Sequence, residues 1–152
     1  MQGGFNGQYY HSIDDKGRVS IPARFRELLE RDGDQVLFIS QHRLLKQKCL
    51  ALYPPREWER VLGRIREKNS LNPDVQAYQT HLLGNTHEVE VDKQGRILIP
   101  PHLREYGGIQ REVTFQGVLD HFVLWDKATH AKFERAAEQT VTNPRFLERL
   151  EL

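Results

Sequence analysis

The chain has 152 residues, with 22 Lys and Arg against 21 Asp and Glu, 38% hydrophobic residues and a formal net charge of +1. This composition excludes a disordered chain, which would be less apolar, and a membrane protein, which would be less charged. The sequence has no apolar run near the roughly 20 residues of a membrane span, and residues 1–10 lack the pattern of a signal peptide. The single cysteine, Cys49, leaves no internal disulfide. These features predict a cytoplasmic protein.

The first of two predicted units covers residues 5–69 and has the order ββαββα. Pro22, which has no N–H, ends the second strand and suits the first turn of a helix. After Pro54-Pro55, apolar residues recur at i, i+3, i+4 and i+7, which predicts an amphipathic helix. The predicted elements are strands at 9–13 and 18–21, a short helix ending near Gly33, strands at 35–40 and 49–53, and the amphipathic helix with Trp58, Val61, Leu62 and Ile65.

A second unit of the same order is predicted at residues 80–140. A connecting helical segment at 70–79, opened by Asn72-Pro73, joins it to the first unit, and Asn143-Pro144 opens a C-terminal helical tail at 141–152. The predicted elements of the second unit are strands at 87–91 and 96–99, a short helix ending near Gly107, strands at 112–116 and 122–125, and a final helix.

The two units are copies of one sequence. Residues 14–27 align with residues 92–105, and seven of the 14 pairs are identical, where average composition would give about one. The identical residues are the Asp, Gly and Arg of a turn, then Ile-Pro, then Arg-Glu. Neither unit alone could bury much of its sheet. We therefore expect an α+β fold in which both units build one small, pseudo-twofold β-barrel with flanking helices.

The duplicated turn resembles that of a known family. Two Asp-x-x-x-Arg hairpins, each continuing into Gly-Arg-x-x-Ile-Pro, are similar to the MraZ proteins, which belong to the AbrB-like group of swapped-hairpin DNA-binding barrels. The resemblance runs from Phe5 to about Leu150 and includes the Tyr53-Pro54 step and Leu83-Gly84 before the second copy. One departure is the second turn, where Lys93 and Gln94 replace the Asp15 and Lys16 of the first.

The resemblance implies a function. MraZ proteins are bacterial transcriptional regulators associated with the nucleoid, and they form closed, ring-like homo-oligomers. They bind short direct repeats in double-stranded DNA upstream of their own gene, which heads the cluster for division and cell-wall synthesis. We therefore expect a repressor of that cluster, without a membrane partner, a small-molecule substrate or a cofactor.

Arg18 and Arg96 are the predicted DNA contacts, because a guanidinium beside a tight turn can bind phosphate or guanine in a bidentate way. The alternative is an internal ion pair with Asp14 or Asp92, and the two roles are compatible. Lys16 and Lys93 at the turn tips are candidate phosphate contacts, or solvated turn lysines. Structural roles in the turns are expected for Asp14, Gly17, Asp92 and Gly95.

Further basic residues have more ordinary interpretations. Arg24, which is matched by His102 in the second copy, could line the same DNA face, together with Arg26 and its counterpart Arg104, or pair with neighbouring acids. A basic stripe on the amphipathic helix, formed by Arg56, Arg60, Arg64 and Lys68, is typical of a solvated or subunit-facing helix side.

Two other classes of function compete with the regulator. An antitoxin-type module would bind DNA through the barrel and a partner protein through a long, disordered C-terminal arm. A purely structural ring would assemble without binding DNA. Enzyme signals are lacking: the sequence has no phosphate-binding glycine motif and no paired histidines typical of a metal site, and Cys49 lies in an apolar strand.

Overall fold

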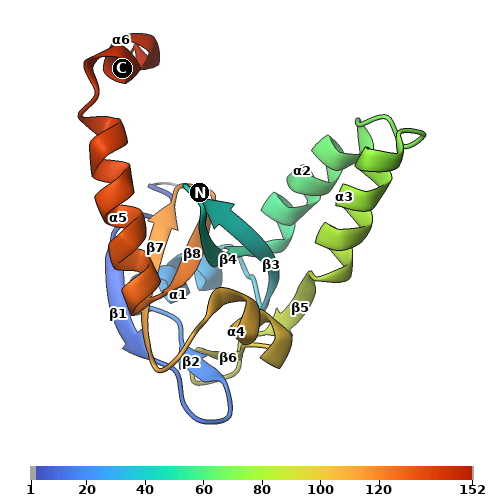
Figure 1. The fold of residues 1–152 in the computed structure, drawn as a ribbon. Helices are drawn as coiled ribbons and strands as arrows, with labels where there is room; N and C mark the ends of the chain where they lie inside the picture. The colour runs from blue at the N-terminus through green and yellow to red at the C-terminus, as the bar shows by residue number, and fades with distance from the viewer. Residues whose placement is uncertain (1–2, 152) are drawn as a thin grey trace.

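The computed structural model describes residues 3–151 and has a mixed α+β fold (Figure 1). The predicted order of strands and helices is confirmed in both copies. In the first copy these are β1 (Gln8–Ser12), β2 (Arg18–Ser20), α1 (Ala23–Arg31), β3 (Val36–Leu44), β4 (Gln47–Tyr53) and α2 (Pro55–Arg66). After α3 (Pro73–Gly84), the second copy has β5 (His87–Glu90), β6 (Arg96–Leu98), α4 (Pro101–Gly107), β7 (Glu112–Val118), β8 (His121–Asp126) and α5 (Lys127–Val141), followed by α6 (Pro144–Leu150).

The two copies share one antiparallel sheet, and at each edge a strand of one copy pairs with a strand of the other. The six-stranded sheet has the order β1-β7-β8-β4-β3-β5, so β1 of the first copy pairs with β7 of the second, and β5 of the second pairs with β3 of the first. The short strands β2 and β6 pair only with each other, and Val19 lies opposite Ile97. Each copy therefore completes the ladder of the other.

The predicted closed barrel is not confirmed. Among residues 3–151, the strand ladders form one open sheet with β1 and β5 at its edges and a separate two-stranded ribbon, β2–β6. Within each copy, the two strands that flank the Asp-x-x-x-Arg turn do not pair with each other. Asp14 N–H donates to Arg18 O at 2.9 Å and closes the turn, but β1 and β2 then diverge to partners in the other copy. The apolar face of β2 explains this exchange, because Val19 is 2% exposed and packs with Ile97 in the shared core.

One sheet face carries the main core. Phe25 of α1 packs against Phe5 and Phe122 with ring centroids 5.3 and 4.8 Å apart, and Leu103 of α4 joins the same buried cluster. On the opposite face, Trp125 stacks on Phe133 of α5 at 4.7 Å, beside buried Cys49. Burial raises the pKa of the Cys49 thiol to about 12, which keeps it protonated and unreactive.

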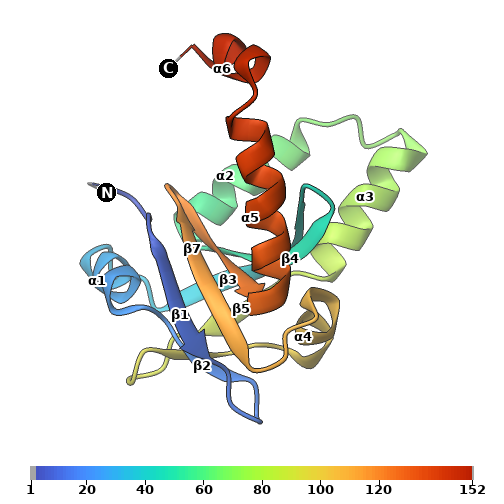
Figure 2. The same cartoon turned by 60° about the vertical axis from the view of Figure 1, so that its left-hand side comes forward.

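The outer helices project from this body (Figures 1 and 2). In α2 only Trp58 is buried, and α3 has no buried residue, while α6 lies at the end of the molecule opposite the β2–β6 ribbon. The predicted caps are present: Asn72 Oδ1 accepts from Asp74 N–H at 2.8 Å, and Asn143 Oδ1 accepts from Arg145 N–H at 2.9 Å. Within residues 3–151, no helix combines the length and the apolar character that crossing a membrane would require.

Candidate nucleic-acid interface

The turn between β1 and β2 is organised by one carboxylate. Asp14 Oδ1 accepts hydrogen bonds from the backbone N–H groups of Lys16 and Arg18, both at 2.9 Å, while Oδ2 accepts from Arg18 Nε at 3.0 Å. The backbone N–H of Arg18 and, to a smaller extent, its side chain lower the pKa of Asp14, so the carboxylate is ionised at neutral pH. A single anion therefore shapes the turn and orients the guanidinium.

The second copy repeats this geometry closely. Asp92 Oδ1 accepts from the N–H groups of Gln94 at 2.8 Å and Arg96 at 2.9 Å, and Oδ2 accepts from Arg96 Nε at 3.1 Å. The pKa of Asp92 is likewise lowered, chiefly by the backbone N–H of Arg96. The exchange of Lys16 for Gln94 leaves the turn unchanged, because that position contributes its backbone N–H.

The arginine side chains remain open to solvent. The exposed fractions of the Arg18 and Arg96 side chains are 39% and 33%. Each uses Nε for its aspartate, and within residues 3–151 neither terminal pair of guanidinium nitrogens donates a hydrogen bond. The ion pair that the sequence offered as an alternative to DNA contact is thus present, and it leaves the outer edge of each guanidinium available.

The two arginines lie on one face of the β2–β6 ribbon. The register places Arg18 opposite Leu98 and Ser20 opposite Arg96, and directly paired residues share a face. The reverse face carries Val19 and is buried. Diagonal neighbours in such a ladder have Cα atoms about 7–8 Å apart, which is the separation expected between Arg18 and Arg96.

Each copy also makes hydrogen bonds and packing contacts to the turn of the other. Ile99 N–H donates to Gly17 O at 2.8 Å, and Ile21 N–H donates to Gly95 O at 2.9 Å. Both glycines have positive φ, +89° and +76°. A Cβ at Gly95 would overlap the guanidinium of Arg26 from α1, because that side chain lies directly across the turn.

Arg104 lies in the corresponding place on the first turn, 3.4 Å from where a Cβ of Gly17 would be. The sequence marks this pair, because Arg26-Glu27 and Arg104-Glu105 are identical in the two copies. The position of each of these two arginines across the turn of the other copy could not be predicted, since it depends on the exchange of strands between the copies.

The other predicted DNA contacts have different surroundings. Lys16 and Lys93 are exposed at the two turn tips, at opposite ends of the ribbon. Arg24 on α1 is exposed and donates through Nη1 to Glu27 Oε2 at 3.1 Å, which is the pairing with a neighbouring acid that the sequence allowed. Figure 2 shows both turns at the end of the molecule opposite α6.

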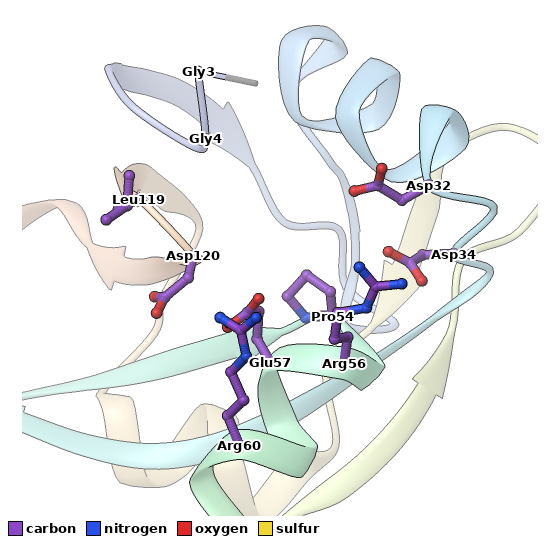
Figure 3. A pocket seen from close by; sticks show the side chains of 10 residues that line it. All are labelled: Gly3, Gly4, Asp32, Asp34, Pro54, Arg56, Glu57, Arg60, Leu119 and Asp120. Atoms are coloured by element: carbon purple, nitrogen blue, oxygen red, sulfur yellow. The ribbon is translucent and has the colours of Figure 1, made fainter. Parts of the chain in front are cut away.

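A pocket of about 420 Å³ lies elsewhere, between α1, α2 and the β7–β8 turn (Figure 3). Arg56 extends toward Asp32 and Asp34, and Arg60 Nη1 donates to Glu57 Oε2 at 3.3 Å. Burial and the neighbouring Asp32 raise the pKa of Asp34. The pocket contains two members of the basic stripe, Arg56 and Arg60, but none of the predicted DNA contacts.

A second groove lies beside the β3–β4 turn and is lined by Leu45, Lys46 and residues of α5 and α6, including Arg149. Among residues 3–151, no group of three or more His, Cys, Asp or Glu side chains could hold a metal ion.

These features define a class of protein: a duplicated α+β fold whose copies exchange strands and display paired arginines on a two-stranded ribbon. The family model described as "MraZ protein, putative antitoxin-like" matches this chain twice, over residues 5–80 and 82–147. The chain belongs to the MraZ family.

Relatives named "Transcriptional regulator MraZ" match most of the chain. The Syntrophobacter fumaroxidans protein is 38% identical over 140 residues, which cover 90% of this chain and 91% of the relative. The Acetivibrio thermocellus protein is 43% identical over 124 residues, 82% of each chain. The Serratia proteamaculans protein is 37% identical over 145 residues, 92% of this chain and 93% of the relative.

Proposed function

We propose that this protein is a sequence-specific, DNA-binding transcriptional regulator. The observation that carries the proposal is the β2–β6 ribbon, whose outer face holds Arg18 and Arg96 in fixed poses with their terminal nitrogens free. The names of its relatives, which are called transcriptional regulators, agree with this role.

The ribbon has the dimensions of a major-groove reader. The major groove is about 12 Å wide and admits a two-stranded β-ribbon. Residues 17–21 span four strand rises, or about 14 Å, so a ribbon laid across the groove brings its two ends to the flanking phosphates. Lys16 and Lys93 lie at those ends and are the proposed phosphate contacts.

One ribbon alone would bind weakly. Acidic residues lie in the adjoining turn and helices, among them Asp15 in the first turn, Glu27 on α1 and Glu105 on α4, so the local excess of positive charge is small. Each neutralised phosphate contributes only about −0.9 to the slope of log K against log salt concentration. We therefore propose that the protein acts as a homo-oligomer, in which several ribbons bind successive direct repeats and multiply the affinity.

Exposed apolar side chains support the oligomer. Leu71, at 85%, and Tyr78, at 59%, are exposed before and on α3, and Leu147, at 51%, is exposed on α6. The charges of the 420 Å³ pocket and the second groove are complementary. In the pocket the acids Asp32, Asp34, Glu57 and Asp120 outnumber Arg56 and Arg60, whereas the charged residues of the second groove are Lys46 and Arg149. Because these grooves differ, a contact between them is head-to-tail and can close into a ring.

The proposed role is repression of the protein's own gene cluster for division and cell-wall synthesis. A ring bound across direct repeats of the promoter would occlude that promoter, and the protein would be found on the nucleoid. The antitoxin-type alternative predicts a long C-terminal arm without regular structure. Residues 127–150 form α5 and α6 with one short break and do not themselves make such an arm.

The test is a titration of labelled duplex from upstream of the protein's own gene. Replacement of Arg18 or Arg96 by Ala is expected to weaken binding about 5- to 150-fold each, the effect of about 1–3 kcal/mol for one bidentate contact with a base, whereas Lys16→Ala or Lys93→Ala should lower the salt slope by about 0.9. Arg135→Ala, which removes one exposed arginine from α5, is the matched control. Unchanged binding by the Arg18→Ala, Arg96→Ala double variant would overturn the assignment.

A further inference from the structure

The outer face of the β2–β6 ribbon is not symmetric. The repeat relates Arg18 to Arg96 and Ser20 to Leu98, so the arginines match while the residues two positions further along each strand differ. If both copies had the same residue at the position of Ser20 and Leu98, exchanging the two strands by the pseudo-twofold rotation would leave the face unchanged. With Ser20 beside Arg96 and Leu98 beside Arg18, it presents a polar half and an apolar half.

Leu98 is held outward by the ladder. Its neighbours Ile97 and Ile99 are each 1% exposed and face the core, so alternation along the strand directs the Leu98 side chain to the opposite face. Leu98 is 54% exposed on a face whose other members are polar or charged. A rotation of the strand that buried Leu98 would expose both isoleucines, so this side chain remains available for an external contact.

We propose that Leu98 is a specificity-determining residue that contacts the C5-methyl group of a thymine beside the base pair bound by Arg18. This inference rests on the proposed function. In the major groove, thymine alone among the four bases presents a methyl group, and an apolar side chain is its usual contact. The Ser20 hydroxyl can donate or accept a hydrogen bond, so the half of the site beside Arg96 has no such requirement.

The asymmetry of the ribbon therefore sets the direction of the bound sequence. A methyl-bearing base lies on the Leu98 side, and a base with a polar edge lies on the Ser20 side. Such a site has no twofold symmetry, so each ribbon binds it in one orientation.

The experiment uses the full-length protein and duplexes selected by it from a library with a randomised core. In the selected duplex, each thymine is replaced in turn by uracil, which removes only the methyl group. The expected result is one position on the Arg18 side where uracil weakens wild-type binding about 4-fold, the effect of about 0.8 kcal/mol for one buried methyl-sized group. Leu98→Ala should bind the thymine and uracil duplexes equally, while Ser20→Ala should keep the wild-type preference for thymine.

The outcomes separate the two proposals. If the wild-type protein selects no duplex and shows no salt-dependent binding, the proposed function fails. If the wild-type protein binds but its affinity does not fall with uracil at any position, the proposed role of Leu98 is refuted while DNA binding stands. This measurement needs no variant. An unchanged uracil penalty in Leu98→Ala, with circular dichroism and sedimentation like those of the wild type, would refute it as well.

Discussion

At the scale of single residues, the interface depends on side chains that act across the repeat boundary. Arg26 belongs to the first copy but lies against Gly95 in the turn of the second, and Arg104 lies against Gly17 in the reverse sense. The aspartates position the arginines of their own copy, whereas these two arginines pack over the turn of the other copy. Each turn, whose conformation its own aspartate and glycine define, is thus packed against a side chain from the other copy.

Gly95→Ala is predicted to destabilise the protein by about 2–3 kcal/mol. A positive φ disfavours any Cβ by about 1–2 kcal/mol, and at this site the Cβ must also displace Arg26. Gly33→Ala is the matched control, because Gly33 also has a positive φ, +74°, but nothing lies within 4 Å of its added Cβ. Urea unfolding of both variants measures the difference.

A double-mutant cycle extends this comparison. In a protein that already carries Arg26→Ala, the Gly95→Ala substitution should lower the free energy of unfolding only by the cost of the positive φ. The effects of the two substitutions should therefore not add. Full additivity would show that Arg26 does not contact the turn.

At the scale of elements, the β3–β4 hairpin contains unfavourable backbone geometry. Its two loop residues, Leu45 and Lys46, have φ of +46° and +71°, values that two-residue hairpins usually assign to Asn and Gly. Sequence analysis predicted the paired strands but ended the first at residue 40, whereas β3 continues to Leu44. The polar residues Gln41, His42 and Arg43 concealed this extension, because the end of the hairpin projects beyond the core.

Replacement of Leu45-Lys46 by Asn-Gly is predicted to stabilise the fold by about 1–2 kcal/mol, since both residues then adopt positive φ at little cost. Thermal and urea unfolding measure the gain. Binding to promoter DNA by a single protomer should not change, because the loop is outside the β2–β6 ribbon. A loss of stability would mean that the Leu45 side chain makes a stabilising contact with the α5–α6 groove that it lines.

At the scale of the whole molecule, three partly or fully buried histidines link stability to pH. Burial lowers the pKa of His11, His42 and His130 from the ordinary value of 6.5. His130 is 7% exposed beside Trp125, and its Nε2 lies 3.4 Å from Glu134 Oε1 without making a hydrogen bond. Glu134 opposes the effect of burial, which nevertheless remains the larger influence.

The free energy of unfolding is therefore predicted to fall as the pH drops below about 6.5. In that range the unfolded chain binds protons that the folded histidines do not yet accept, so acid favours unfolding; above it, both states are neutral and this contribution is constant. Urea unfolding at pH 7.5 and 5.5 measures the effect, and His130→Phe should reduce it. Substitution of the exposed His81 controls for the loss of an imidazole. Equal stability of the wild type at both pH values would contradict the prediction.

The sequence by itself determined the duplication, the order of strands and helices, the aspartate-organised turns and the family. These features are encoded locally: Asp14 and Gly17 define a turn through their own side chain and backbone, and the second copy repeats the signal. The choice of Arg18 and Arg96 as DNA contacts rests on the same local signal and stays a prediction.

Only the tertiary structure decided which strands pair. A strand as short as β2, in which only Val19 is apolar, can satisfy its hydrogen bonds with any neighbour, so its sequence does not specify β6, some 80 residues away, as its partner. The open sheet, the placement of Arg26 on Gly95 and the exposure of Leu98 beside Arg18 all follow from that pairing. They depend on contacts between the two copies, which a pattern within either copy cannot reveal.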